Sequence, residues 1–439
     1  MNTKRETFVS NFGLLMTMIG VAVGLGAVWR FPYMVGKFGG AAFVLFYLAV
    51  VLFVGIPALM AEWTLGRYTE RGTLGAYEKG GFPGGRYVGY FLFFIVFCAT
   101  GYYSTALGWV LFHAVGEILS AVGIGLNASS ILPPQEGFNL TSMLLQMMMT
   151  GIVIFTCGLV LVRGLRKGIE KVSRWIVPSL FAILIILIVR SLSLPGASKG
   201  LQWYLGGFRF SQLTPSVLAA AMGMAFFSMS LGGTFMVIYG SYLDRKTPIL
   251  KNAVFTGIGA LTAGLLAGLA IFPAVFSFGL EPSSGPGLIF STLPQTFDLM
   301  PMGWFFGFLF FIGLFGAAYL SDVAAFEVLV GGLVDNTQLT RKKAVLICCC
   351  VVYFLSIPPM INYKIFIPWD LLFGSGMQVL GSLMAVLTTA WFIKRAKALD
   401  ELSRGSEKRF PRFLYWWIRI VIPAAILIVG VNWILESLI

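Results

Sequence analysis

The chain has 439 residues, of which 58% are hydrophobic and only 11% are charged. This balance excludes an ordinary soluble domain, and the recurring apolar stretches of about 20 residues have the length of bilayer-spanning helices. The formal net charge of +13 would suit a nucleic-acid-binding protein, but the basic residues gather in alternate loops, which is typical of membrane topology. The expected partner is therefore the lipid bilayer, and no nucleic acid is expected.

The apolar stretches predict an all-α membrane protein with about 11 transmembrane helices. Strand-length alternation is lacking, and every backbone polar group inside a bilayer must be paired internally, so each stretch is expected to be helical. The predicted spans are 11–35, 40–65, 87–120, 143–163, 172–193, 214–240, 252–279, 303–333, 342–358, 366–393 and 414–436.

The distribution of basic residues predicts the orientation in the membrane. The N-terminal segment and the loops after the even-numbered spans carry most of the 31 Lys and Arg residues, whereas the loop at 120–142 carries none. Excess positive charge marks the cytoplasmic side. We therefore expect a multi-pass protein of the cell membrane with a cytoplasmic N-terminus. Because the number of predicted spans is odd, the C-terminus is expected outside.

The first span contains a break in its apolar pattern. Gly20, Gly24 and Gly26 fall within seven residues and are followed by the stretch Trp29–Tyr33, which includes Arg30 and a proline. Non-helical backbone at membrane depth is tolerated only where it lines a cavity or is buried in protein. The carbonyl groups that it frees can ligate a cation, and the freed N–H groups can hold an anion. This break predicts a binding site at the bilayer midplane.

The sixth span contains a second break, from Phe226 to Thr234, where small polar residues and a glycine pair interrupt the apolar run. Two interrupted spans in corresponding positions point to an inverted repeat with its site between the halves. We expect one transporter domain over 1–439, with a first five-helix repeat at 1–195, a second at 205–395 and an extra helix at 410–439.

Two pairs of opposite charges flank the predicted site. Arg30 and Asp370 both fall toward the predicted outer side, and Arg5 and Asp335 both fall near the predicted inner side. An ion pair that breaks in each cycle should be hydrated and of modest energy, which suits a gate. Each pair is therefore predicted to be a gate, one above the site and one below it.

These motifs closely resemble the neurotransmitter:sodium symporter family, whose bacterial members include leucine and tryptophan transporters. The resemblance implies a secondary active transporter rather than an enzyme, carrying out Na⁺-coupled symport of an amino acid or a related small molecule by alternating access. Eleven spans instead of twelve look like the shorter bacterial members, which implies a prokaryotic origin. The stretches that carry the resemblance include 20–43, 62–68, 163–170, 226–242 and 370–376.

The resemblance also implies a substrate site between the two breaks. The substrate amino group would donate to main-chain carbonyls, and its carboxylate would meet main-chain N–H groups and a tyrosine hydroxyl. Members that carry monoamines have an aspartate where this chain has Gly24, so a substrate with its own carboxylate is expected. The same resemblance places Tyr242 with the inner gate. The implied substrate-binding residues are Ala22, Leu25, Gly26, Tyr103, Phe227, Ser228, Ser230 and Gly233.

For coupling ions, the resemblance implies one Na⁺ site and the loss of another. The implied Na⁺ ligands are the carbonyl oxygens of Gly20, Val23 and Ala317 and the hydroxyl of Ser321. The second family site uses a side-chain amide at the position of Ala27 and another in the seventh span, near Gly259 or Ala260. None of these three residues has a side-chain oxygen, so one Na⁺ is expected.

Asp322 follows the implied Na⁺ ligand Ser321 directly, and its role is left open. It is predicted either to bind the ion or to face the substrate. The alternative function keeps the fold but uses a proton on Asp322, or no coupling ion. Small residues at Ala99, Gly233 and Ala325 would enlarge the pocket for an aromatic or bulky substrate, whereas Asp322 would suit a cationic one.

Overall fold

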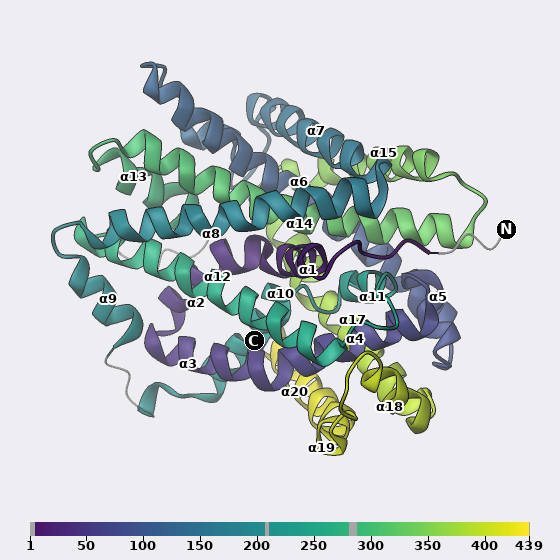
Figure 1. Cartoon of the computed structure of the whole chain (residues 1–439). Helices are drawn as coiled ribbons and strands as arrows, with labels where there is room; N and C mark the ends of the chain where they lie inside the picture. Colours follow the sequence, from purple (N-terminus) through teal and green to yellow (C-terminus); the bar gives the residue numbers. More distant parts are fainter. Residues whose placement is uncertain (1–4, 207–209, 281–287, 439) are drawn as a thin grey trace.

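The computed structural model describes residues 5–206, 210–280 and 288–438, which form a bundle of helices with no β-strand among them (Figure 1). Positions 1–4, 207–209, 281–287 and 439 of the predicted repeats lie outside the described residues. The helices of the first part are α1 (Asn11–Leu25), η1 (Gly26–Arg30), α2 (Phe31–Phe38), α3 (Ala41–Val50), η2 (Val51–Gly55), α4 (Ile56–Thr69), α5 (Thr73–Lys79), α6 (Gly85–Ala121), η3 (Ala128–Ile131), α7 (Leu140–Val162), η4 (Leu165–Glu170), α8 (Lys171–Leu192) and α9 (Ala197–Leu205).

The second part repeats the pattern of long helices joined by short ones. Its helices are η5 (Phe210–Gln212), α10 (Pro215–Ser228), α11 (Phe235–Gly240), α12 (Ile249–Ser277), η6 (Leu288–Thr292), α13 (Leu293–Asp298), α14 (Gly303–Asn336), α15 (Arg341–Met360), α16 (Tyr363–Trp369), η7 (Asp370–Gly376), α17 (Met377–Leu387), η8 (Thr388–Phe392), α18 (Arg395–Ser403), α19 (Arg412–Trp416), η9 (Trp417–Val421) and α20 (Ile422–Leu438).

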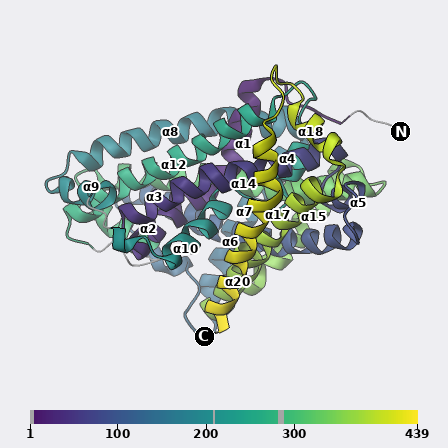
Figure 2. The ribbon, with the colours of Figure 1, turned by 90° about the horizontal axis from the view of Figure 1, so that it is seen from below.

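Nine helical stretches of the described residues are long and apolar enough to cross a membrane. They match nine of the predicted spans. The predicted sixth span is divided into α10 and α11, which have 14 and 6 residues and are therefore each too short to cross alone. The predicted last span is helical from α19 to α20, and α20 packs against α17 and α10 (Figure 2). The all-α membrane fold with two broken helices is confirmed, whereas the repeat boundaries stay predictions.

The centre of the bundle is α14, which packs closely against both α1 and α6. The helices α8 and α12 also pack on α1, while α7 and α15 pack on α6. This arrangement buries the broken part of α1 from Met18 to Leu25. The main-chain N–H and C=O groups that the break releases are therefore surrounded by protein, which can supply hydrogen-bond partners that lipid cannot.

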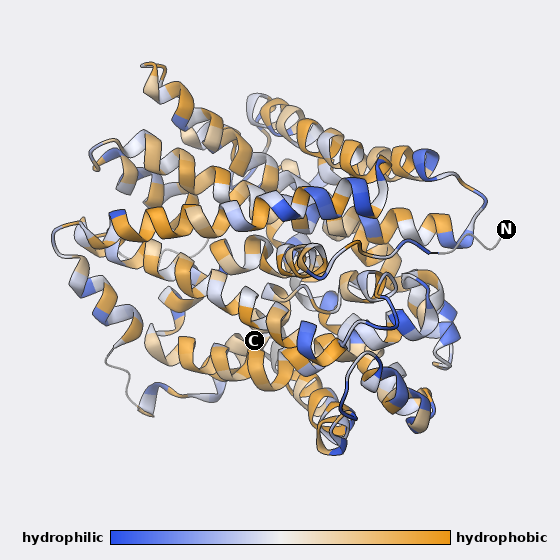
Figure 3. Ribbon diagram, viewed as in Figure 1, coloured by the Kyte–Doolittle hydropathy of each residue, from blue (hydrophilic) through white to orange (hydrophobic). Residues whose placement is uncertain are grey.

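The two ends of the bundle differ in polarity. Hydrophilic residues are concentrated on α5, α18 and the start of α8, at the end that also holds the N-terminal segment (Figure 3). We call this the basic end, because the Lys- and Arg-rich loops lie there. At the opposite end lie α2, α9 and α13 (Figure 1).

Candidate substrate and ion site

The break in the first helix occurs at Gly24, as the sequence predicts. Its dihedral angles are φ 38° and ψ −162°, which are not helical. A β-carbon at this position would lie 2.6 Å from the Ser321 hydroxyl oxygen and 3.2 Å from that of Tyr103. Both the backbone conformation and the close packing therefore require glycine. Beyond the break, the chain continues as the π-helical turn η1 and then α2.

The break in the sixth helix lies between α10 and α11, where Ser230, Gly232 and Thr234 all have positive φ angles. Glu62 on α4 is fully buried, and its carboxylate accepts a hydrogen bond of 2.9 Å from the Gly232 N–H. The Thr234 hydroxyl lies 2.7 Å from that of Thr73. These contacts supply partners for polar groups that the helix itself no longer satisfies.

The two breaks face each other. The Ser230 hydroxyl donates a 2.6 Å hydrogen bond to the carbonyl of Val21, on the first broken helix. A β-carbon at Gly26 would lie only 2.9 Å from the α-carbon of Ser228, so the two backbones are in close contact there. Glycine is what allows this approach.

A small cavity of about 40 Å³ lies between the breaks and α6. At its edge, the Leu25 N–H donates a 3.0 Å hydrogen bond to the Tyr103 hydroxyl. Five of the predicted substrate-binding residues line this cavity, together with residues from α6, α14 and α17. The lining residues are Gly24, Leu25, Gly26, Ala99, Thr100, Tyr102, Tyr103, Phe227, Ser230, Phe235, Ser321, Ala325 and Gln378.

Other predicted substrate-binding residues lie outside the lining of this cavity. The Ser228 hydroxyl is 2.9 Å from that of Tyr47, so its side chain is directed to the other side of α10. The Ala22 side chain is buried in the core. At Gly233, a β-carbon would overlap the ring of Phe235. The space expected from the missing side chain at Gly233 is therefore filled by Phe235.

Sequence reasoning missed Phe235, Thr100, Tyr102 and Gln378 as lining residues. On α6, Thr100 lies three residues before the predicted Tyr103, and Tyr102 lies three residues after the predicted Ala99, so helical spacing could have indicated them. Gln378 follows the π-helical turn η7, and no local pattern links it to the site. Phe235 reaches the site because the chain leaves helical geometry just before it.

The predicted Na⁺ ligands come from the first break and α14. The Ser321 hydroxyl oxygen lies 3.5 Å from the Gly20 carbonyl oxygen and 3.0 Å from that of Val21. Carbonyl and hydroxyl oxygens of this kind are suited to Na⁺, and unwound backbone commonly supplies them in transporters. Leu320, next to Ser321, packs on Gly20: a β-carbon added at Gly20 would be 2.5 Å from the Leu320 side chain. A methyl group therefore occupies the place beside the hydroxyl.

Around Ala27, the structure offers only small apolar residues on the facing helix. Ala27 is fully buried, and its carbonyl oxygen lies against Gly264 on α12. A β-carbon added at Gly264 would be 3.7 Å from that oxygen. Ala260 and Ala263 on the same helix are also fully buried. The Gly259 backbone instead lies against Ile19. These residues contribute no side-chain oxygen to the predicted second ion site.

Asp322 is directed away from the cavity. Its buried carboxylate accepts hydrogen bonds from the Ser104 hydroxyl at 2.9 and 3.1 Å and contacts the Cys157 thiol at 3.8 Å. Ser104 lies on α6 and Cys157 on α7, so the carboxylate sits in a helix–helix interface. This placement gives no support to the prediction that Asp322 contacts the substrate, because its oxygens already have partners on the far side of α14.

At the basic end, the predicted gate residues Arg5 and Asp335 are in contact. The Arg5 guanidinium lies 2.8 Å from the Asp335 carboxylate and also donates to the Glu70 carbonyl at 3.0 Å. The Gly72 N–H donates to the same carboxylate at 3.1 Å. The Arg5 guanidinium carbon lies 4.9 Å from the centre of the Tyr242 ring.

A second ion pair continues this cluster toward the centre. The Tyr242 hydroxyl donates to the buried carboxylate of Glu327 at 2.5 Å, and Arg341 pairs with the same carboxylate at 2.5 Å. Arg341 also donates to the Leu161 carbonyl at 2.7 Å. The sequence indicated Tyr242 but not the Arg341–Glu327 pair, which joins α15 to the C-terminal half of α14.

Toward the opposite end, a cavity of about 480 Å³ continues from the small one, sharing Leu25, Tyr103 and Phe227 as lining residues. Both predicted outer gate residues, Arg30 and Asp370, line it. The Arg30 guanidinium carbon lies 4.5 Å from the centre of the Phe227 ring. The site is thus accessible through this cavity, whereas ion pairs close the path to the basic end.

Two broken helices that face each other across a buried cavity, with unequal access from the two ends, define a secondary transporter. The sequence profile of the Sodium:neurotransmitter symporter family matches residues 5–122 and 130–437, so the chain belongs to this family.

Relatives agree with this assignment along nearly the full chain. The chain is 33% identical over 450 residues to the sodium-dependent transporter YhdH of Bacillus subtilis, with 98% of each chain covered. It is 30% identical over 436 residues to a sodium-dependent transporter of Methanocaldococcus jannaschii, covering 94% of this chain and 87% of the other. Among solved structures, MhsT in complex with L-phenylalanine superposes with a TM-score of 0.86 at 31% identity, covering 97% of this chain and 99% of MhsT.

Proposed function

We propose that this symporter couples the inward movement of one Na⁺ to that of an amino acid with a bulky apolar side chain. The observation that carries the proposal is the pair of facing breaks, which places main-chain N–H groups and carbonyls beside the Tyr103 hydroxyl around one cavity. Helix N-termini and freed N–H groups favour a carboxylate, and freed carbonyls favour cations.

In this proposal, the substrate carboxylate binds the N–H groups of Leu25 and Gly26 and the hydroxyl of Tyr103. The Leu25 N–H donates to the Tyr103 hydroxyl oxygen at 3.0 Å, and this proximity supports a role for both groups at one carboxylate. The substrate ammonium group donates to the carbonyls of Ala22, Phe227 and Ser230. A substrate that brings its own carboxylate suits Gly24, where the packing leaves no room for an acidic side chain.

The substrate side chain would lie against Ala99, Thr100, Ala325 and Phe235. The small residues favour a bulky side chain, and the aromatic ring favours an apolar one. The presence of L-phenylalanine in the MhsT structure supports the same class of substrate. The proposal leaves Asp322 out of substrate contact, because its carboxylate bonds Ser104 on the other side.

Na⁺ would be held by the carbonyls of Gly20, Val23 and Ala317 and the hydroxyl of Ser321. Bound there, the ion would join the first broken helix to α14. We further propose that the basic end is cytoplasmic, with the C-terminus outside, because loops rich in Lys and Arg mark that side. Arg5, Asp335 and Tyr242 then form the inner gate, and Arg30 and Asp370 form the outer one.

Uptake by the purified protein in proteoliposomes tests the function directly. Radiolabelled L-phenylalanine should accumulate when Na⁺ is outside, and unlabelled bulky apolar amino acids should compete better than glycine or dopamine. Accumulation that is equal in choline buffer, or that follows a pH gradient without Na⁺, would contradict Na⁺ coupling. Phe235→Ala should extend the preference to larger side chains, with Phe278→Ala, which lies at the end of α12, as a control.

A further inference from the structure

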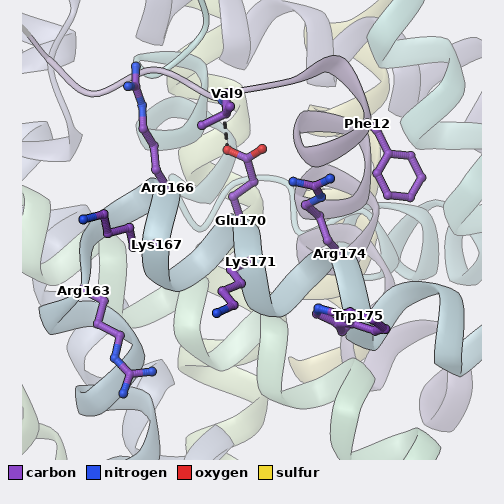
Figure 4. Close-up of a pocket in the computed structure, with 9 residues that line it drawn as sticks. All are labelled: Val9, Phe12, Arg163, Arg166, Lys167, Glu170, Lys171, Arg174 and Trp175. Atoms are coloured by element: carbon purple, nitrogen blue, oxygen red, sulfur yellow. Dashed lines mark hydrogen bonds between the residues drawn. The ribbon is translucent and has the colours of Figure 1, made fainter.

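A second cavity, of about 940 Å³, lies at the basic end, away from the proposed substrate site. It is formed where the N-terminal segment and the start of α1 pass over η4 and α8 (Figure 4). Its polar lining is almost wholly cationic, while Val9, Phe12 and Trp175 supply apolar walls. The basic lining residues are Arg163, Arg166, Lys167, Lys171 and Arg174.

These cations have few polar partners among the described residues. Among the residues that the structure describes, none of them forms an ion pair with a carboxylate. The one acidic residue of the lining, Glu170, is buried, and its carboxylate accepts the Val9 N–H at 3.0 Å. Arg166 donates to the Thr7 carbonyl at 2.7 Å, and the Arg174 guanidinium carbon lies 5.8 Å from the Phe12 ring centre. With five basic side chains and one carboxylate in its lining, the cavity carries a net positive charge.

An exposed apolar stripe runs from this cavity along α8. Of the membrane-length helical stretches, Leu165–Leu192 has only 28% of its apolar window buried inside the protein, so it faces lipid. Trp175 is 75% exposed at the edge of the cavity. Tryptophan is typical of the membrane–water interface. The stripe continues through Pro178, Ala182, Ile185, Ile186, Val189 and Leu192, which share one face of the helix.

We propose that this cavity binds the headgroup of an anionic phospholipid, whose acyl chains lie along the exposed face of α8. Clusters of Lys and Arg next to a transmembrane helix attract anionic headgroups, and Arg forms strong hydrogen bonds with phosphate. A free phosphate would satisfy the charge but would leave the adjoining apolar stripe without a role. The occupant would touch both the N-terminal segment and α8, which Glu170 already joins through Val9.

Native mass spectrometry of the delipidated full-length protein, titrated with phosphatidylglycerol or phosphatidylcholine, tests this site. The wild type should bind one phosphatidylglycerol at least about tenfold more tightly than phosphatidylcholine, because several cations act together. The triple variant Lys167→Gln, Lys171→Gln, Arg174→Gln should lose this preference. These three side chains form none of the hydrogen bonds that hold the N-terminal segment, because Arg166 donates to the Thr7 carbonyl and Glu170 accepts from the Val9 N–H.

A matched variant removes the same charge elsewhere at the basic end: Lys342→Gln, Lys343→Gln, Lys408→Gln. These residues are exposed and lie outside the cavity lining, so this variant should keep the preference. Equal loss in both triple variants, or unchanged binding in the first, would overturn the proposal. Binding of glycerophosphoglycerol or inorganic phosphate as tight as that of the lipid would also overturn it, since the site would then recognise a free anion. Trp175→Ala, which keeps every charge, should weaken lipid binding while leaving thermal stability in detergent unchanged.

Discussion

The two ends of the molecule differ in how their charges are used. At the basic end, Arg5, Arg67 and Arg341 each lie within 2.8 Å of a carboxylate. At the opposite end, Arg30 and Asp370 line a cavity of about 480 Å³. The path to the site is therefore closed by ion pairs at the basic end and open through the cavity at the opposite end.

The ion pairs of the basic end also differ among themselves. In the Arg67–Glu401 pair the side chains are only 2% and 3% exposed, whereas in the Arg5–Asp335 pair they are 18% and 16% exposed. A fully buried pair is costly to break because one charge is left without water or partner, while a partly exposed pair opens at a lower cost. Burial therefore separates a structural pair from a pair that can act as a gate.

The largest expected effect is on stability, from breaking the buried pair. Glu401→Gln would leave the Arg67 guanidinium buried without its countercharge, which we expect to cost about 3 kcal/mol of folding free energy. Thermal unfolding in detergent measures this. Asp400→Asn is the control, because Asp400 belongs to an exposed pair with Arg404. A melting temperature that falls equally in both variants would contradict the distinction by burial.

Breaking the partly exposed Arg5–Asp335 pair should instead impair transport. Asp335→Asn removes the partner of Arg5 and weakens the acceptor of the Gly72 N–H. We expect uptake to fall about tenfold, as the loss of roughly 1.4 kcal/mol would imply, with little change in melting temperature. Labelling of a Ser230→Cys variant by a membrane-impermeant thiol reagent from the basic side should increase. If labelling from that side is unchanged, Asp335 does not close the path.

At the opposite end, Asp370→Asn should produce a smaller and different effect. Closure over the substrate would be slowed, so we expect uptake to fall several-fold while equilibrium binding of the substrate is nearly retained. Scintillation proximity binding and proteoliposome uptake measure the two quantities. Glu136→Gln, in the exposed pair with Lys364, is the control. Equal losses of binding and uptake would assign Asp370 to the binding site rather than to a gate.

The smallest expected effect concerns Na⁺, which would favour closure of the path at the basic end. With Ala27 and the small residues of α12 offering no second ion site, uptake should rise hyperbolically with Na⁺ and have a Hill coefficient near one. Na⁺ should also lower the labelling of Ser230→Cys from the basic side, since it would tie the first broken helix to α14. A Hill coefficient approaching two would contradict the single site.

The sequence predicted the features that depend on local chemistry. The break at Gly24 follows from clustered glycines, and the contact of Arg5 with Asp335, 330 positions apart, follows from their shared side of the membrane. Features that depend on how non-helical segments turn could not be predicted. Phe235 fills the volume left by Gly233, and Gln378 enters the site from another helix.

Asp322 illustrates the same limit within a regular helix. Its position next to Ser321 suggested a role at the ion or substrate, but successive residues on a helix point about 100° apart. That rotation directs its carboxylate to Ser104 and Cys157 instead. Adjacency in sequence is therefore a poor guide to a shared site on a helix, unless the spacing is three or four residues.

The packing at Gly24 restricts how this protein could evolve a new substrate class. An aspartate there, which would replace the substrate's own carboxylate, would place its β-carbon against Ser321 and in a backbone conformation that side chains rarely adopt. Conversion of an amino-acid carrier into an amine carrier would therefore first require a permissive substitution on α14, or a change in the backbone conformation of the first broken helix. Until that change occurs, the single substitution would be a loss of function, so this route between substrate classes is closed to one-step evolution.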